Sequence, residues 1–353
     1  MNWRNFLFGL LCFILILSSV PAYGQEGVSE KKPQNKYTEQ YFQEKKEKKN
    51  ESNSEENNNL VDPQVEEQII LETLSYYYEE DLKVASALVQ FYNDSDLYEK
   101  TMSLIKEDKV EVMHKIMDIY SSVKDPSDQE VLRDYIERYA RSSGDKKAIN
   151  FLDKNTTQSE SESVNIQAVY GTAAGDWAYN NYNKYSLDYP KFSVWGSDCA
   201  NFVSQAIHVG GSNAMEGTWY IIKKNSVYWE PENADQLNYS WDLSDPSPWI
   251  SVSQFRKYWV PKSTVHSMSH DYYVENHKSV YGRSIYKGDV VVFHKGVAGW
   301  VTIPTHLMII SAYDTVDKDF KLAGHSNERQ ALPLLTAIYD YSYIEILEIP
   351  YDL

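Results

Sequence analysis

The apolar and polar positions of the chain follow different patterns in successive segments. An apolar run extends from Phe6 to Val20, and residues 25–60 then consist mostly of Glu, Lys, Asn, Gln and Ser. A segment of that composition cannot bury enough apolar surface to offset the entropy of ordering its chain. We therefore predict that residues 25–60 form a disordered polar tether.

The first apolar run has the features of a signal peptide. Arg4 places a positive charge before the run, and its length of about 15 residues falls short of the roughly 20 that span a bilayer. Ala22 and Gly24 supply small residues at the positions that precede cleavage before Gln25. We predict export with removal of residues 1–24, and a retained anchor helix is the alternative.

Apolar residues then recur at a helical period between residues 61 and 155. A period near 3.6 residues is typical of amphipathic helices, and a small bundle of about three to five of them is expected. This segment holds no cysteine and a single histidine, His114, with no nucleophile or second ligand near it in sequence. We predict an accessory helical domain that docks to an unknown protein partner. The apolar positions include Val65, Ile69, Leu74, Val110, Met113, Met117, Leu132, Ile136 and Tyr139.

The pattern changes again after a polar linker at residues 156–163. Residues 164–353 contain eight of the nine tryptophans and several β-rich runs. Because helical segments precede the strands, we predict an α+β fold whose C-terminal domain, residues 164–353, contains an antiparallel sheet. The predicted strands are Ile285–Phe293, His306–Tyr313, Phe320–Ala323 and Tyr343–Ile349.

Composition and charge narrow the possible partners. The chain has 353 residues, 42% of them hydrophobic, which is typical of a globular protein. With 34 basic and 51 acidic residues its formal net charge is −17, which argues against nucleic acid as a partner. There is no phosphate-binding loop and no cysteine cluster, so we predict neither a cofactor nor a metal. After signal cleavage we expect no membrane association.

The strongest local signal surrounds Cys199, the one cysteine that remains after residues 1–24 are removed. Asp198 is a favourable helix N-cap, and Gly210 and Gly211 are favourable stops. The apolar stripe between them predicts a buried helix with Cys199 in its first turn. Free backbone N–H groups there favour the thiolate, which is the nucleophilic form. A cysteine that merely packs under the turn is the alternative, but its polar neighbours favour a reactive one.

A cysteine nucleophile needs a base, and His306 opens an apolar strand. A polar imidazole at that place needs a partner, and a thiolate would be one. The next predicted strand leads to His325 and Asn327. If these strands are antiparallel neighbours, His325 or Asn327 would lie beside His306 and hold its ring in the correct tautomer.

The order of these motifs resembles a known bacterial family. The residues Asp198-Cys199-x-Asn201-Phe202-Val203-Ser204-Gln205, followed by Gly210-Gly211, Gly288-Asp289 and His306, are similar to the "putative amidase domain", or amidase family 6. The similarity covers roughly Val169 to Leu347. That family is related to the papain-like cell-wall hydrolases of the NlpC/P60 and CHAP type. The resemblance implies a papain-like fold and thiol-dependent cleavage of amide bonds in peptidoglycan stem peptides, by a secreted or cell-wall-associated bacterial protein.

The resemblance also implies roles for individual residues. Cys199 matches the nucleophile and His306 the general base, while His325 matches the third polar residue, with Asn327 as competitor. Asp198 matches an acidic residue that helps to bind a substrate amine. We include Asn201 among the substrate-binding candidates. Trp195 joins them because aromatic residues could line a groove for sugar-peptide strands, although core packing is the commoner reason for such residues.

Two alternatives belong to other functional classes. His266 and His270 are four residues apart, and Asp271 and His277 follow, which is a spacing that can bind zinc on a helix. The sequence between them does not predict a helix, and no Glu stands between the two histidines. The second alternative is a non-catalytic protein that binds the cell wall, in which Cys199 would be unreactive.

Overall fold

The computed structural model describes residues 35–49, 60–154, 164–192 and 197–351. Contacts divide the chain into two compact units. The first, here called the helical unit, comprises residues 1–52, 72–156 and 297–301, and the second, the sheet unit, comprises the remainder. The predicted signal peptide, the predicted linker at 156–163 and Trp195 lie outside the described residues.

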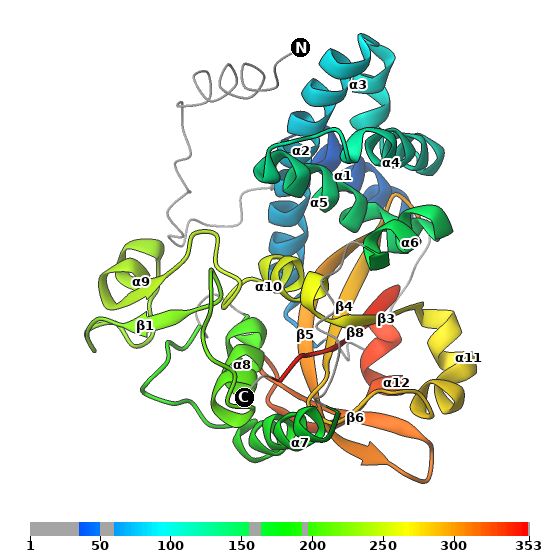
Figure 1. Ribbon diagram of the computed structural model, residues 1–353. Coiled ribbons are helices and arrows are strands. Elements are labelled where there is room, and N and C mark those ends of the chain that lie inside the picture. The colour runs from blue at the N-terminus through cyan, green and yellow to red at the C-terminus, as the bar shows by residue number, and fades with distance from the viewer. Residues whose placement is uncertain (1–34, 50–59, 155–163, 193–196, 352–353) are drawn as a thin grey trace. The chain divides into compact units, whose positions relative to one another are not determined.

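The helical unit contains the predicted amphipathic helices. Helix α5 begins as its sequence indicates: the Asp125 carboxylate accepts a hydrogen bond from the backbone N–H of Ser127, and Pro126 occupies the first turn. Gly144 ends the helix with a left-handed φ of 71°. The helices are α1 (Lys36–Lys49), α2 (Pro63–Tyr92), α3 (Asp96–Thr101), α4 (Lys106–Tyr120), α5 (Pro126–Ser143) and α6 (Lys146–Lys154) (Figure 1).

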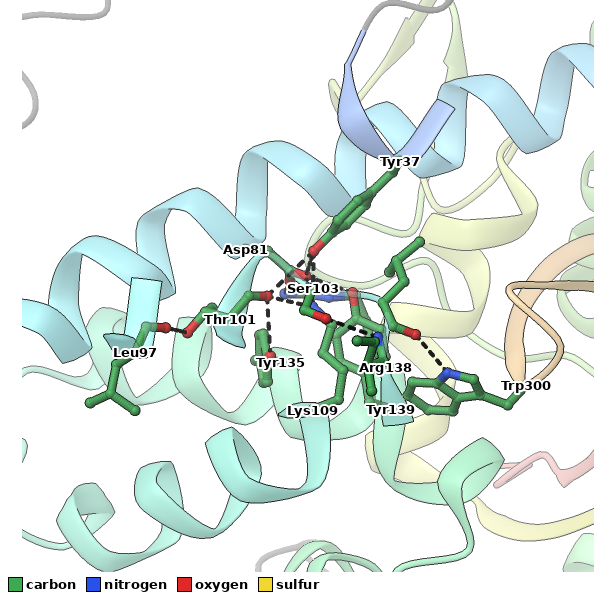
Figure 2. Close-up of polar contacts among 12 residues, drawn as sticks. Tyr37, Asp81, Leu97, Thr101, Ser103, Lys109, Tyr135, Arg138, Tyr139 and Trp300 are labelled. Carbon is green, nitrogen blue, oxygen red and sulfur yellow. Dashed lines mark hydrogen bonds and ion pairs between the residues drawn. The ribbon is translucent and has the colours of Figure 1, made fainter. Parts of the chain in front are cut away.

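Helix α1 lies inside the segment that was expected to be a disordered tether. Its residue Tyr37 is only 1% exposed, and the hydroxyl donates to the Asp81 carboxylate at 2.6 Å. Figure 2 shows Lys109, Arg138 and Tyr139 converging on the same carboxylate, at 2.6–2.7 Å. The segment is therefore not a disordered tether throughout, because the buried side chains of Tyr37 and Thr38 anchor a stretch whose average composition is polar.

The sheet unit is built on six strands in the order β3-β8-β4-β5-β6-β7. Strand β8 pairs antiparallel with both β3 and β4, and β6 pairs antiparallel with β5 and β7, which confirms the predicted antiparallel sheet. The two outer strands, β3 and β7, were not predicted. The strands are β3 (Thr264–Ser269), β4 (Val290–Val297), β5 (Val301–Asp314), β6 (Asp319–Gly324), β7 (Arg329–Pro333) and β8 (Tyr343–Glu348).

Helices cover both faces of this sheet (Figure 1). Val290 and Val292 of β4 pack into a cluster with residues of α7, α8 and α10, whereas Val291 and Phe293 pack with residues of α11 and α12. A strand buried on both faces reads as a continuous apolar run, which is why β4 was predictable. These helices are α7 (Val164–Asn181), α8 (Cys199–Gln205), α10 (Val252–Trp259), α11 (His270–Tyr281) and α12 (Leu334–Ala337).

A smaller element completes the sheet unit. Strands β1 (Ile221–Lys223) and β2 (Trp241–Leu243) form an antiparallel pair, and α9 (Ala234–Ser240) precedes β2. The overall class is α+β, as predicted, and the papain-like identity stays a prediction. Among the helices that the structure describes, none has the length and apolar character to cross a membrane.

Candidate active site

Cys199 is the first residue of α8 and is 1% exposed. The helix continues through a π-helical turn, Ala206–Gly210, to Gly211, so the helix predicted between Asp198 and the two glycines is confirmed. Asp198 occupies the N-cap position, but its side chain makes no capping hydrogen bond. The Asp198 carboxylate instead contacts the His325 ring, the Asn201 side chain and the Phe192 N–H.

The thiol is enclosed by polar groups from neighbouring segments. Ser197 Oγ lies 3.3 Å from Sγ, and the backbone N–H groups of Leu307 and Ala200 also hydrogen-bond to it. Burial nevertheless raises the pKa of Cys199 above its usual value, and these hydrogen bonds offset only part of that shift. The expectation that the helix start favours the thiolate is thus corrected, because loss of hydration outweighs the N–H groups.

Asp198 and His325 form a buried pair. Nδ1 of the histidine lies 2.6 Å from Asp198 Oδ2, and its ring is held between Phe202 and Tyr185, with centroid distances of 4.1 and 4.6 Å. This arrangement fixes both the ring plane and the tautomer, since an ionised Asp198 accepts the proton of Nδ1–H. Nε2 of His325 is buried and has no partner among the described residues.

The other oxygen of Asp198 holds the chain around the cysteine. Oδ1 accepts hydrogen bonds from Asn201 Nδ2 at 2.8 Å and from the Phe192 N–H at 3.3 Å. Asn201 Nδ2 also donates to the Pro190 carbonyl, and its Oδ1 accepts from Trp249 Nε1 at 3.0 Å. Both side chains are therefore occupied inside the protein, and their predicted role in substrate binding stays a prediction.

His306 lies within β5 and is 1% exposed. Its ring lies 5.9 Å from the Phe293 ring, and Nδ1 has no partner in the part of the chain that is described. Burial lowers the pKa of His306 to about 3, so the ring is neutral. The thiol is hydrogen-bonded by the N–H of the next residue, Leu307, rather than by the His306 ring. The assignment of His306 as the base stays a prediction.

Three further residues, Glu66, Ser326 and Tyr341, lie near these groups, and the sequence did not single them out. Burial raises the pKa of Tyr341 well above its usual range, and nearby Glu66 and Cys199 raise it further. Ser326 adopts a left-handed φ of 82°, and its Oγ accepts the Asp198 N–H at 3.1 Å. Neither a helical period nor a sequence motif identifies these residues. They are far apart in the sequence and come together only in the folded chain.

A hollow of the sheet unit borders Tyr341. Its volume is about 610 Å³, and acidic and aromatic side chains line it. The lining residues are Ser269, His270, Asp271, Tyr339, Asp340, Tyr341 and Ser342.

The residues of the alternative zinc site do not share a helix. His266 belongs to β3 and pairs with Glu348, whereas His270 begins α11 and its Nδ1 lies 2.9 Å from Asp271 Oδ1. Within the described ranges no group of three His, Cys, Asp or Glu side chains has the geometry to hold a metal ion.

Comparison with known protein families places these residues in context. A family model described as "putative amidase domain" matches residues 169–346, slightly more than half of the chain. The match contains Cys199, His306 and His325, and the chain belongs to this family. The family description indicates a hydrolase that acts on amide bonds. No curated protein and no solved structure matches the chain.

Proposed function

We propose that the sheet unit hydrolyses an amide bond with Cys199 as the nucleophile. One observation carries this proposal: the matched domain holds a buried free thiol and three buried histidines, His294, His306 and His325, each with a ring nitrogen that has no partner among the described residues. His294 contacts Glu345 through its other ring nitrogen at 3.2 Å, and only His306 and His325 are among the predicted site residues. A buried polar atom without a partner costs about 1–3 kcal/mol of stability. Such groups call for a functional explanation, and perturbed titratable groups concentrate at functional sites.

The proposed reaction is acyl transfer through a thioester. His306 takes the proton from Sγ, and the thiolate attacks the carbonyl carbon of the substrate amide. The C–N bond breaks as His306 returns that proton to the leaving amine. His306 then takes a proton from water, the hydroxide displaces Sγ from the acyl carbon, and the thiol regains its proton. The products are an amine and a carboxylic acid.

Asp198 and His325 have a supporting role in this proposal. With Nδ1–H donated to Asp198, the Nε2 lone pair of His325 is an acceptor. It would accept the N–H of the base and hold the imidazolium that forms, as a third polar residue does in nucleophile–base systems. This makes Asp198 a positioning residue that acts through His325.

Peptidoglycan stem peptides are the proposed substrate. The similarity of the Cys199 motif to cell-wall hydrolases supports this class, and the predicted signal peptide supports secretion to the cell wall. A papain-like arrangement is part of the same proposal, since a helix-borne cysteine packs against a sheet that carries the histidine.

Incubation of residues 25–353 with purified bacterial cell walls tests the proposed function. We expect new amine and carboxyl ends, identified by mass spectrometry, from the unchanged protein and not from the Cys199→Ala variant. Equal release by both proteins would eliminate Cys199 as nucleophile, and inhibition by a chelator would then favour the zinc alternative. If neither protein releases fragments but both sediment with the walls, the non-catalytic binding protein is the better explanation.

A further inference from the structure

A chain segment that lies between two parts of the helical unit in the sequence belongs to the sheet unit. Residues 60–71 cluster with the sheet unit, although α2 continues beyond them into the helical unit. Leu60 and Val61 are 4% and 2% exposed, and they pack in the cluster that contains Phe293 and Tyr341. We call residues 60–66 the strap.

Polar contacts hold both ends of the strap. The Leu60 carbonyl accepts a hydrogen bond from Asn327 Nδ2 at 2.9 Å. At the other end, the Glu66 carboxylate accepts from Thr305 Oγ1 at 3.2 Å and lies 3.1 Å from Lys295 Nζ. The Tyr341 hydroxyl also donates to Glu66. Glu66 therefore receives contacts from three separate segments of the sheet unit.

The residues that hold the strap are neighbours of the candidate catalytic groups. Thr305 directly precedes His306 in β5, and Asn327 follows His325 by two residues. Tyr341 donates to Glu66 and interacts electrostatically with Cys199. The strap thus contacts residues that adjoin His306 and His325 in the sequence, and a tyrosine that interacts with Cys199.

The same groups are closed to solvent. Cys199 and His306 are each 1% exposed, His325 is 3% exposed and Asp198 is 4% exposed. A substrate carbonyl must come within about 3–3.5 Å of the attacking atom. The described arrangement therefore leaves no room for a substrate, and a covering element has to move before reaction.

We propose that the strap is an autoinhibitory segment, which closes the Cys199 site in the resting protein and opens it when displaced. The inference rests on the proposed function, because the closed group is the proposed nucleophile. Three apolar side chains, Leu60, Val61 and the partly buried Val65, and the polar contacts of Leu60 and Glu66 hold the strap. That attachment is small enough for reversible local opening, in which a segment separates while the remaining fold persists.

The protonation states of the closed site agree with a resting form. Burial raises the pKa of Cys199 and lowers that of His306, so both groups are uncharged near neutral pH. Access of water would reverse both shifts, because hydration favours the thiolate and the imidazolium. Displacement of the strap would thereby also increase the thiolate fraction of the cysteine.

The rate of alkylation of Cys199 by iodoacetamide in the full chain tests the strap. Peptide mass spectrometry separates Cys199 from Cys12. In Glu66→Gln we expect labelling about tenfold to a hundredfold faster, because loss of a charge-assisted hydrogen bond shifts the closed–open ratio by that factor. Val61→Asp should also accelerate labelling, since it places a carboxylate in an apolar cluster. Glu67→Gln makes the same change as Glu66→Gln, and Gln64→Asp also introduces an aspartate. Both substitutions lie at less buried positions, and both variants should label at the unchanged rate.

Low urea concentrations distinguish local opening from unfolding. Labelling through strap displacement should depend weakly on urea, whereas labelling through global unfolding rises steeply with it. The proposal is overturned if Glu66→Gln labels no faster than Glu67→Gln, or if its faster labelling has the urea dependence of global unfolding. Rapid labelling of the unchanged chain would also overturn it. These readouts need no cell-wall cleavage, so their failure is distinguishable from failure of the proposed function.

Discussion

In the proposed mechanism, the pairing of Asp198 with His325 would let a residue beside Cys199 act through the base. Replacing Asp198 by Asn removes the anionic acceptor of Nδ1–H and allows the other tautomer. We expect the turnover number to fall by about 10²–10⁴-fold, the usual contribution of acid–base catalysis, with a smaller change in KM. The cleavage rate on cell walls measures this effect. Asp188→Asn, the same change at an exposed position, should leave the rate unchanged, and equal losses in both variants would contradict the positioning role.

Burial of His306 has a consequence for acid stability. Its folded-state pKa of about 3 lies below the unfolded value of about 6.5, so only the unfolded chain binds a proton between these limits. The contribution of a neutral His306 to stability is therefore complete above about pH 6.5. It is lost as pH falls toward 3, at up to about 1.4 kcal/mol per pH unit.

Urea unfolding at about pH 7 and about pH 5 measures this loss for the unchanged protein and for His306→Gln. The variant should lose less stability between the two pH values, because glutamine does not titrate. His270→Gln is a control at a more exposed ring and should keep the full pH dependence. An identical pH dependence in His306→Gln would contradict the buried neutral state.

At the scale of elements, the sequence predicted what local patterns determine. The apolar runs of β4 and β5 are visible because both of their faces are buried, and the helix of Cys199 is visible because Asp198 and Gly211 bound it. Strand β3 was missed because its residues Thr264–Ser269 are mostly polar and half-exposed at the edge of the sheet. An edge strand owes its conformation to its partner β8 and not to its own residues.

For the candidate site too, local patterns indicated some residues and missed the contacts between them. Residue types and order indicated Cys199, His306 and His325. The Asp198–His325 bond joins residues separated by 127 positions, and the contact of Asn327 with Leu60 joins residues separated by 267. Contacts at such separations depend on the register and placement of whole elements, which no local pattern encodes. For this reason neither the strap nor Tyr341 was predicted.

Helix α1 offers a test of how one side chain orders an element. Tyr37 is buried and bonded to Asp81, whereas Tyr41 of the same helix is partly exposed. We expect Tyr37→Ala to cost about 3–5 kcal/mol of stability, as large aromatic truncations do, and to remove hydrogen-exchange protection from residues 36–49. Tyr41→Ala should cost much less. Retained protection in Tyr37→Ala would show that other contacts order α1.

At the scale of the whole molecule, the formal net charge of −17 bears on how the protein would meet its proposed substrate. Bacterial walls that carry anionic polymers should repel an acidic protein at long range. Raising the salt concentration from about 0.01 M to 0.15 M shortens the screening length from about 30 to about 8 Å. We therefore expect binding of the Cys199→Ala protein to such walls to stay constant or to strengthen as salt increases. Sedimentation with intact walls measures this, since the variant should not degrade them. Binding that weakens over the same salt range would instead require a basic contact surface on the protein. Repeating the measurement with walls stripped of anionic polymers would show whether that surface contacts those polymers.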